Sequence, residues 1–189
     1  MNNSMLWIGI LPVIAFLILD SYTDKKKALL GAIVLGLGEF IFTLIQFGSI
    51  DYLTVLTLLL LLVFVGISLK TNNDFYFKIQ SAVVNIILAL ILIVSQYLFG
   101  KFILLDGFIK YVGINFFAKY NPAITKEITI QLLEALNTQL PWWLFIHSAL
   151  TIYAAAKWNK WLWAIIRIPG LYIFLFFVMK NIAAGILPK

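Results

Sequence analysis

Residues 52–69, YLTVLTLLLLLVFVGISL, contain no charged side chain. An α-helix of that length rises about 27 Å, close to the ~30 Å hydrocarbon core of a bilayer. Lipid offers no water to bare backbone groups, and the run lacks the polar and apolar alternation of a barrel strand. The stretch therefore predicts a transmembrane α-helix.

Further apolar runs of similar length lie on both sides of this one. Of the 189 residues, 63% are hydrophobic and 12% are charged, whereas soluble domains have about 25% charged residues. We expect an all-α membrane protein, a polytopic bundle of about six transmembrane helices that forms a single integral membrane domain over residues 1–189. The first and fifth runs are short, so five spans plus one interfacial segment is the alternative. The runs occupy residues 4–19, 28–47, 52–69, 81–99, 141–156 and about 163–179.

Residues 101–140 have a different character from the apolar runs. Such a mixed segment lies on a membrane surface more readily than it crosses the bilayer. We expect one or two amphipathic interfacial helices here, between the fourth and fifth spans, with Asn121 as an N-cap before Pro122. Charged residues interrupt the apolar ones at helical spacings: Lys101, Asp106, Lys110, Lys119, Lys126, Glu127 and Glu134.

The net charge and the lack of cysteine limit the kinds of partner and site that the chain can have. The formal net charge of +6 is spread over the links between runs, which indicates contact with anionic lipid headgroups and not with nucleic acid. The chain has no cysteine, so disulfides and thiolate metal sites are excluded. Residues 1–4 carry no Lys or Arg and no small-residue cleavage pattern follows, so we expect the first run to be retained as a helix.

Glu39 stands near the middle of the second run. A charged side chain at that depth costs a few kcal/mol to insert, so we expect it to face the bundle and to be paired or protonated. A structural role or a contact with a partner is favoured over a proton relay or an ion path. Close helix approach is favoured by the four-residue spacing of Ala28, Ala32 and Gly36.

Other polar residues in the apolar runs predict contacts between helices. Asn85, Ser95 and Gln96 lie in the fourth run, and Gln96 could instead bind a substrate. His147 is the single histidine and lacks companion ligands, so we expect no metal and no cofactor. The sequence also lacks zinc-protease, serine-hydrolase, P-loop and paired intramembrane aspartate motifs, and we expect no enzymatic activity.

A polar link, GISLKTNNDFYFK over residues 66–78, separates the third and fourth runs. Asn72, Asn73 or Asp74 can cap the helix that follows, while the aromatic residues and Lys78 suit the headgroup level.

The order and spacing of Gly66, Asn73, Asp74, Lys78, and then Ser95 and Gln96 resemble the bacterial septation protein A family of inner-membrane proteins. The resemblance covers residues 8–102 well and 141–187 more loosely. Three departures mark the chain as similar to a diverged member: Gln80 stands where the family usually has a second lysine, Phe102 replaces a proline, and Glu39 has no recognised counterpart. The 101–140 segment is also longer than usual.

The resemblance implies a function without a known reaction. It implies an inner-membrane protein that acts in septation, elongation or envelope maintenance through contacts with the bilayer and with other integral membrane proteins, such as the division or elongation machinery. Two alternatives stand beside it. One is a small transporter or lipid-handling protein that uses Glu39 in a polar cavity. The other is an accessory subunit of a larger membrane complex, docked through residues 101–140.

The orientation in the membrane rests mainly on the same resemblance. Family members have a basic link between the second and third spans, which implies cytoplasmic N- and C-termini. The three lysines at 25–27 argue for the opposite orientation, and Lys and Arg are nearly balanced between the two sides. We expect both termini in the cytoplasm.

Overall fold

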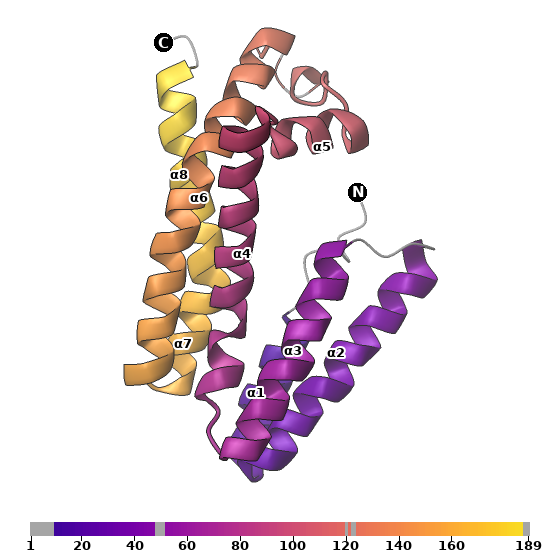
Figure 1. The fold of residues 1–189 in the computed structure, drawn as a ribbon, viewed down its shortest axis with the longest axis vertical. Helices are drawn as coiled ribbons and strands as arrows, with labels where there is room; N and C mark the ends of the chain where they lie inside the picture. The colour runs from indigo at the N-terminus through magenta and orange to yellow at the C-terminus, as the bar shows by residue number, and fades with distance from the viewer. Residues whose placement is uncertain (1–9, 48–51, 120, 122–123, 187–189) are drawn as a thin grey trace. The chain divides into compact units, whose positions relative to one another are not determined.

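The computed structural model describes residues 10–47, 52–119, 121 and 124–186 (Figure 1). This described part is helical and contains no β-strand. The predicted all-α class is therefore confirmed. In chain order the elements are α1 (Leu11–Tyr22), α2 (Lys25–Phe47), α3 (Tyr52–Thr71), α4 (Phe75–Phe99), α5 (Ile103–Tyr111), the 3₁₀ turn η2 (Phe117–Lys119), α6 (Lys126–Lys157), α7 (Lys160–Ile165), the π-helical turn η3 (Ile166–Gly170) and α8 (Leu171–Ile186).

Four helical stretches of the described chain are long and apolar enough to cross a membrane. They correspond to the second, third, fourth and sixth apolar runs of the sequence. The two remaining runs are the first and the fifth. Because these runs are short, the sequence left five spans as the alternative. The four stretches are Lys25–Ile45, Thr54–Thr71, Phe75–Phe99 and Lys160–Ile186, the last of which joins α7, η3 and α8.

Helix α1 covers only part of the first predicted span. It has 12 residues, which corresponds to about 18 Å and is too short to cross the hydrocarbon core alone. Residues 4–9 of the predicted run lie outside the described residues. Pro12 stands near the start of the helix, where a missing backbone N–H does no harm.

Helix α6 begins later than the predicted N-cap and continues beyond residue 140, where the predicted interfacial segment ended. The helix begins at Lys126, where the hydroxyl of Thr125 accepts the N–H of Ile128 at 3.3 Å. The predicted N-cap at Asn121 was therefore wrong. The helix then continues through Pro141 to Lys157, so residue 140 is not a helix end. Proline is tolerated inside membrane helices when neighbouring groups satisfy the freed carbonyl.

The chain divides into two compact units. Unit 1 consists of Met1–Val84 and Thr151–Ile168, and unit 2 of Asn85–Leu150 and Pro169–Lys189. The boundaries between the units fall within α4, α6 and η3.

The core of unit 1 is built on three aromatic rings. Helix α1 packs against α2, and α2 packs against α3 (Figure 1). Phe16 of α1 lies 4.7 Å from Phe77 of α4 between ring centroids, and Phe77 lies 6.0 Å from Trp163 of α7. All three side chains are fully buried. Each such ring pair contributes about 0.5–1.5 kcal/mol beyond the burial of its area.

Unit 2 joins the second half of α4 to α6 and α8. One buried cluster places Ala89 and Leu92 of α4 against Leu140 and Leu144 of α6 and Leu175 of α8. Further along, α6 and α8 form a second cluster that contains Leu132, Val178 and Ile182. The amphipathic first half of α6 therefore buries its apolar face against α8.

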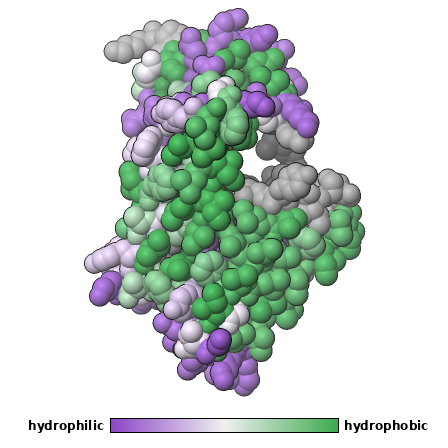
Figure 2. Space-filling model, viewed as in Figure 1, coloured by the Kyte–Doolittle hydropathy of each residue, from purple (hydrophilic) through white to green (hydrophobic). Residues whose placement is uncertain are grey.

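The outer faces of the helices are strongly apolar. Val34, Ile45 and Phe176 are 66%, 78% and 65% exposed. Figure 2 shows apolar residues along the sides of the helices and hydrophilic residues gathered near helix ends. Exposed apolar area of this extent is unfavourable in water, whereas lipid chains solvate it well.

Candidate functional site

A polar cavity lies within unit 1. It has a volume of about 220 Å³, enough for several water molecules at ~30 Å³ each. The described residues that line it include one acidic and one basic side chain, Glu39 and Arg167. The lining residues come from five elements, namely Pro12 on α1, Gly36, Glu39, Phe40 and Thr43 on α2, Thr54, Thr57, Leu58 and Leu61 on α3, Gln80 on α4 and Arg167 on η3.

Glu39 is half-buried on α2 and faces this cavity. Its Oε1 accepts the backbone N–H of Leu11 at 3.2 Å. One turn further along α2, the hydroxyl of Thr43 donates to the carbonyl oxygen of Glu39 at 2.8 Å. The structure therefore gives Glu39 a place in the fold, at the N-terminus of α1, and a place in the cavity wall.

Arg167 is the second charged group of the cavity, and the sequence analysis did not place it there. It lies inside the apolar stretch Lys160–Ile186. Its guanidinium carbon lies 5.3 Å from the Trp163 ring centroid and 5.8 Å from that of Phe77. This geometry is a cation–π arrangement with two aromatic faces.

Gln80 connects the cavity wall to Arg167. Its Nε2 donates to the carbonyl oxygen of Thr57 at 3.1 Å, and its Oε1 accepts from Nη2 of Arg167 at 3.1 Å. Both ends of the buried amide are thus engaged. Sequence reasoning noted Gln80 only as a departure from a lysine, because the partners are far apart in the chain.

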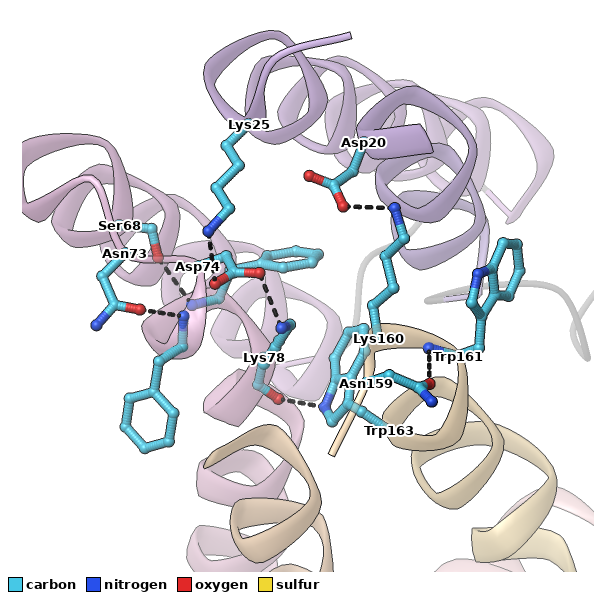
Figure 3. Close-up of polar contacts among 12 residues, drawn as sticks. Asp20, Lys25, Ser68, Asn73, Asp74, Lys78, Asn159, Lys160, Trp161 and Trp163 are labelled. Carbon is cyan, nitrogen blue, oxygen red and sulfur yellow. Dashed lines mark hydrogen bonds and ion pairs between the residues drawn. The ribbon is translucent and has the colours of Figure 1, made fainter. Parts of the chain in front are cut away.

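At one end of unit 1, a polar cluster fixes the link between α3 and α4 (Figure 3). Asn72 has a positive φ of 52° and ends α3, with the N–H of Asn73 bonded to the carbonyl of Ser68 at 3.0 Å. This is a Schellman-type helix end, for which asparagine is the usual substitute for glycine. The side chain of Asn73 then accepts the N–H of Phe75 at 3.0 Å. The predicted cap is therefore confirmed and assigned to Asn73.

Asp74 and its cations make the electrostatic part of this polar cluster (Figure 3). Its carboxylate lies 2.8 Å from Nζ of Lys78 and 3.6 Å from Nζ of Lys25. Burial raises the pKa of Asp74, but the hydrogen bond from Lys78 and the charges of Lys78 and Lys25 lower it by more, so the pKa falls below its ordinary value. Nearby, Lys160 pairs with Asp20 at 2.7 Å.

Trp163 ties α7 to the start of α4. Its indole N–H donates to the carbonyl oxygen of Lys78 at 3.0 Å (Figure 3). Asn159 caps α7 by accepting the N–H groups of Trp161 and Leu162 at 3.0 and 2.9 Å. Trp163 is fully buried in the core of unit 1. It therefore belongs to the packed core and not to the surface of the bundle.

In unit 2 the structure brings together two polar residues that the sequence singled out separately. Asn85 Nδ2 lies 3.2 Å from Nδ1 of His147, and the imidazole meets Phe174 edge to face with centroids 5.5 Å apart. His147 is 1% exposed. This arrangement links α4, α6 and α8 through one buried polar pair.

A second polar network in unit 2 contains Gln96. Its Nε2 donates to the hydroxyl of Thr138 at 3.0 Å, and its Oε1 accepts from Nδ2 of Asn137 at 3.1 Å. Asn137 also accepts the N–H of Leu104 on α5 at 3.2 Å. Sequence reasoning missed Asn137 because the residue lay in the presumed surface segment. Asn137 follows Leu133 by four residues and therefore lies on the same apolar face of the helix. This spacing could have predicted that its side chain is buried.

The predicted packing face of α2 is buried. Ala28 and Ala32 are fully buried in the core of unit 1. Gly36 lies against Leu61 of α3 so closely that a methyl group there would overlap the end of the leucine side chain. These small residues allow α2 to approach its neighbours.

The other residues of the family-like sequence pattern have local roles. The hydroxyl of Ser95 donates to the carbonyl of Leu92 at 2.9 Å. Ser68, in the link that begins at Gly66, accepts the N–H of Phe77 at 2.9 Å. A methyl group added at Gly66 would meet no atom within 4 Å. Packing therefore does not explain the glycine. Within the described residues, no group of three or more His, Asp or Glu side chains is placed to hold a metal ion.

Two curated proteins are similar to this chain, while no family model and no solved structure matches it. The first is the inner membrane-spanning protein YciB of Aeromonas salmonicida, 30% identical over 96 residues, a match that covers 50% of this chain and 52% of that protein. The second is the inner membrane-spanning protein YciB of Psychromonas ingrahamii, 24% identical over 164 residues, with 85% of this chain and 78% of that protein covered. The chain is thus similar to these proteins at low identity.

The similarity confirms the resemblance to an inner-membrane family that the residue pattern had suggested. The match with the Aeromonas YciB protein spans about half the length of that relative. Together with the apolar helices, it places the chain in the inner membrane as a multi-pass protein. Both relatives carry the name of a membrane-spanning protein and not that of an enzyme.

Proposed function

We propose that this protein acts in septation, elongation or envelope maintenance by contacting other integral membrane proteins, without catalysing a reaction. The observation that carries the proposal is the similarity to the two inner membrane-spanning YciB proteins. Their family is the one that the residue pattern around Asn73 and Gln96 resembles.

The contacts of the buried polar residues support a role of this kind. Asn85, Gln96 and Trp163 each form hydrogen bonds that join one helix to another. Their polar groups therefore hold the bundle together. The lipid-facing helix sides expose large apolar groups, for example Phe176 and Phe177 on α8. A second membrane protein can pack on such a surface in place of lipid.

Affinity capture in a mild detergent tests this proposal. The tagged protein is expressed at its natural level, and an unrelated polytopic protein of matched abundance carries the same tag as the control. We expect at least one integral membrane protein of the envelope machinery to be enriched with the first bait and not with the second. Repeated recovery of the protein alone, also after cross-linking in intact cells, would contradict the proposal.

A further inference from the structure

The cavity of unit 1 contains two opposite charges that are not paired with each other. Among the described residues there are four ion pairs, and none of them includes Arg167. Nη2 of Arg167 donates to Gln80, but Nη1 is buried and has no acceptor within the described part of the chain. A buried guanidinium without an anion is costly, and its fork matches a carboxylate or phosphate. An anionic group in the cavity would satisfy Nη1.

Glu39 restricts which anion can enter. Its carboxylate lines the same cavity, and one of its oxygens accepts the N–H of Leu11. A carboxylate has about four acceptor sites, so an ammonium can share it with the donors that Glu39 already has. A ligand with only negative charge would be repelled by Glu39, and one with only positive charge by Arg167, most strongly in the low dielectric of a membrane. A ligand that carries both charges meets neither penalty.

We propose that this cavity binds a zwitterionic group, with an ammonium at the carboxylate of Glu39 and a phosphate or carboxylate at Nη1 of Arg167. Three threonines, Thr43, Thr54 and Thr57, also line the cavity. The volume of about 220 Å³ suits a small head of this type. The inference goes beyond the contact function proposed above.

The backbone at Arg167 also has an unusual form. The residue lies in the π-helical turn η3, which contains Pro169. Such turns are rare in helices and are frequent at functional sites. Because proline cannot donate a backbone hydrogen bond, the regular α-helical ladder is interrupted here. The turn presents the guanidinium to the cavity from within an otherwise apolar stretch.

The zwitterion has two sources in a bacterial membrane environment. One is the phosphoethanolamine head of a phospholipid, and the other is a free, water-soluble zwitterion of the same size. Native mass spectrometry of the purified full chain in detergent separates them. The probes are phosphatidylethanolamine, phosphatidylglycerol with the same acyl chains, and free phosphoethanolamine at millimolar concentration.

The variants test the two charges separately. Glu39→Gln keeps an oxygen for the N–H of Leu11 while it removes the charge. Arg167→Gln keeps a polar group near Gln80 but removes the guanidinium. The control is Lys70→Gln, which removes an exposed cation of α3 that does not line the cavity.

We expect the wild type and Lys70→Gln to prefer phosphatidylethanolamine to phosphatidylglycerol by about tenfold or more. Glu39→Gln should lose this preference by binding phosphatidylglycerol more tightly, a result that misfolding does not produce. Arg167→Gln should weaken binding of both lipids about tenfold. Displacement of the lipid by phosphoethanolamine, or selective binding of phosphoethanolamine alone, identifies the free zwitterion as the ligand. No displacement identifies the lipid head.

Two results would overturn the proposal. One is equal binding of the two lipids by the wild type together with no binding of phosphoethanolamine. The other is a preference for phosphatidylethanolamine that Glu39→Gln leaves unchanged. Neither result bears on the contact function, which affinity capture tests independently.

Discussion

The backbone N–H of Leu11, at the start of α1, donates a 3.2 Å hydrogen bond to Oε1 of Glu39 on α2. The first N–H groups of a helix have no partner within the helix, and the positive end of the helix dipole favours a nearby carboxylate. No side chain of α1 itself provides this cap. Glu39 therefore caps the N-terminus of α1, a helix that is too short to span the membrane.

From this bond we predict how fast the backbone amide of Leu11 exchanges its hydrogen with solvent. Replacing Glu39 by Leu removes the acceptor, whereas Glu39→Gln retains an oxygen at the same distance along the side chain. Loss of a cap costs roughly 1 kcal/mol, which corresponds to about fivefold in an opening equilibrium. Hydrogen exchange of the Leu11 amide in detergent should therefore be about fivefold faster in Glu39→Leu and nearly unchanged in Glu39→Gln. Equal rates in the two variants would contradict the capping role.

The Asp74 cluster predicts a loss of stability at low pH. Lys78 and Lys25 hold the pKa of Asp74 below its ordinary value, against the effect of burial. A lowered folded-state pKa stabilises the fold fully above the unfolded value of about 3.9, and this contribution is lost as the pH falls through the lowered pKa. Thermal unfolding of the wild type in detergent should therefore show a falling midpoint below pH ~4.

The variant Asp74→Asn isolates this effect. At pH 7 it should lower the free energy of unfolding by about 1–2 kcal/mol, because the charge-assisted bond from Lys78 is lost. The difference from the wild type should shrink as the pH falls from about 4 towards 2. The control is Asp106→Asn on α5, which removes an exposed acidic side chain. A constant difference between Asp74→Asn and the wild type at all pH values would argue against the ion pair as the cause.

Two glycines of α2 should respond differently to a larger side chain. Gly36 lies against Leu61, while a methyl group at Gly38 would meet no atom within 4 Å. Gly36→Leu should separate α2 from α3 and lower the free energy of unfolding by about 1–3 kcal/mol. Gly38→Leu should be neutral or stabilising by up to ~1 kcal/mol, because leucine is a better helix former than glycine. Chemical denaturation in detergent measures both, and equal losses would show that the contact with Leu61 is unimportant.

The sequence predicted the fold correctly wherever one local property, such as an apolar run, determines the structure. Long apolar runs predicted α2, α3 and α4, because the backbone in lipid has no alternative to a helix. A cap among residues 72–74 followed from local chemistry, and the structure assigns it to Asn73. The start of α6 did not, because Thr125 and Asn121 are both good caps and only tertiary context selects between them.

The candidate site was predicted less well than the helices. Glu39 was found because a carboxylate stands out in an apolar run. Arg167 and Gln80 were not, since their meeting depends on two helices that are far apart in the chain. The buried Asn137 was missed for a similar reason: its partners Gln96 and Leu104 become neighbours only after folding. Pairing of this kind cannot be inferred from hydropathy.

The bond between Gln96 and Asn137 can be measured as a coupling energy. Asn137 Nδ2 donates to Oε1 of Gln96 at 3.1 Å, so a double-mutant cycle with Gln96→Ala and Asn137→Ala reports the interaction. Polar pairs between membrane helices contribute about 0.6 kcal/mol on average and up to about 1.7 kcal/mol. Because both residues also hold other groups, we expect a coupling of about 1 kcal/mol. The measurement is reversible unfolding in detergent.

A second cycle serves as the control for this measurement. Ser95→Ala with Asn137→Ala should show coupling near zero, since Ser95 precedes Gln96 but bonds to the carbonyl of Leu92. Asn137→Ala alone should be the more damaging single substitution, because the fully buried side chain also accepts the N–H of Leu104. That amide would then lack its acceptor at the start of α5. Similar coupling in both cycles would mean that a general loosening of α4 and α6, and not the hydrogen bond, links these positions.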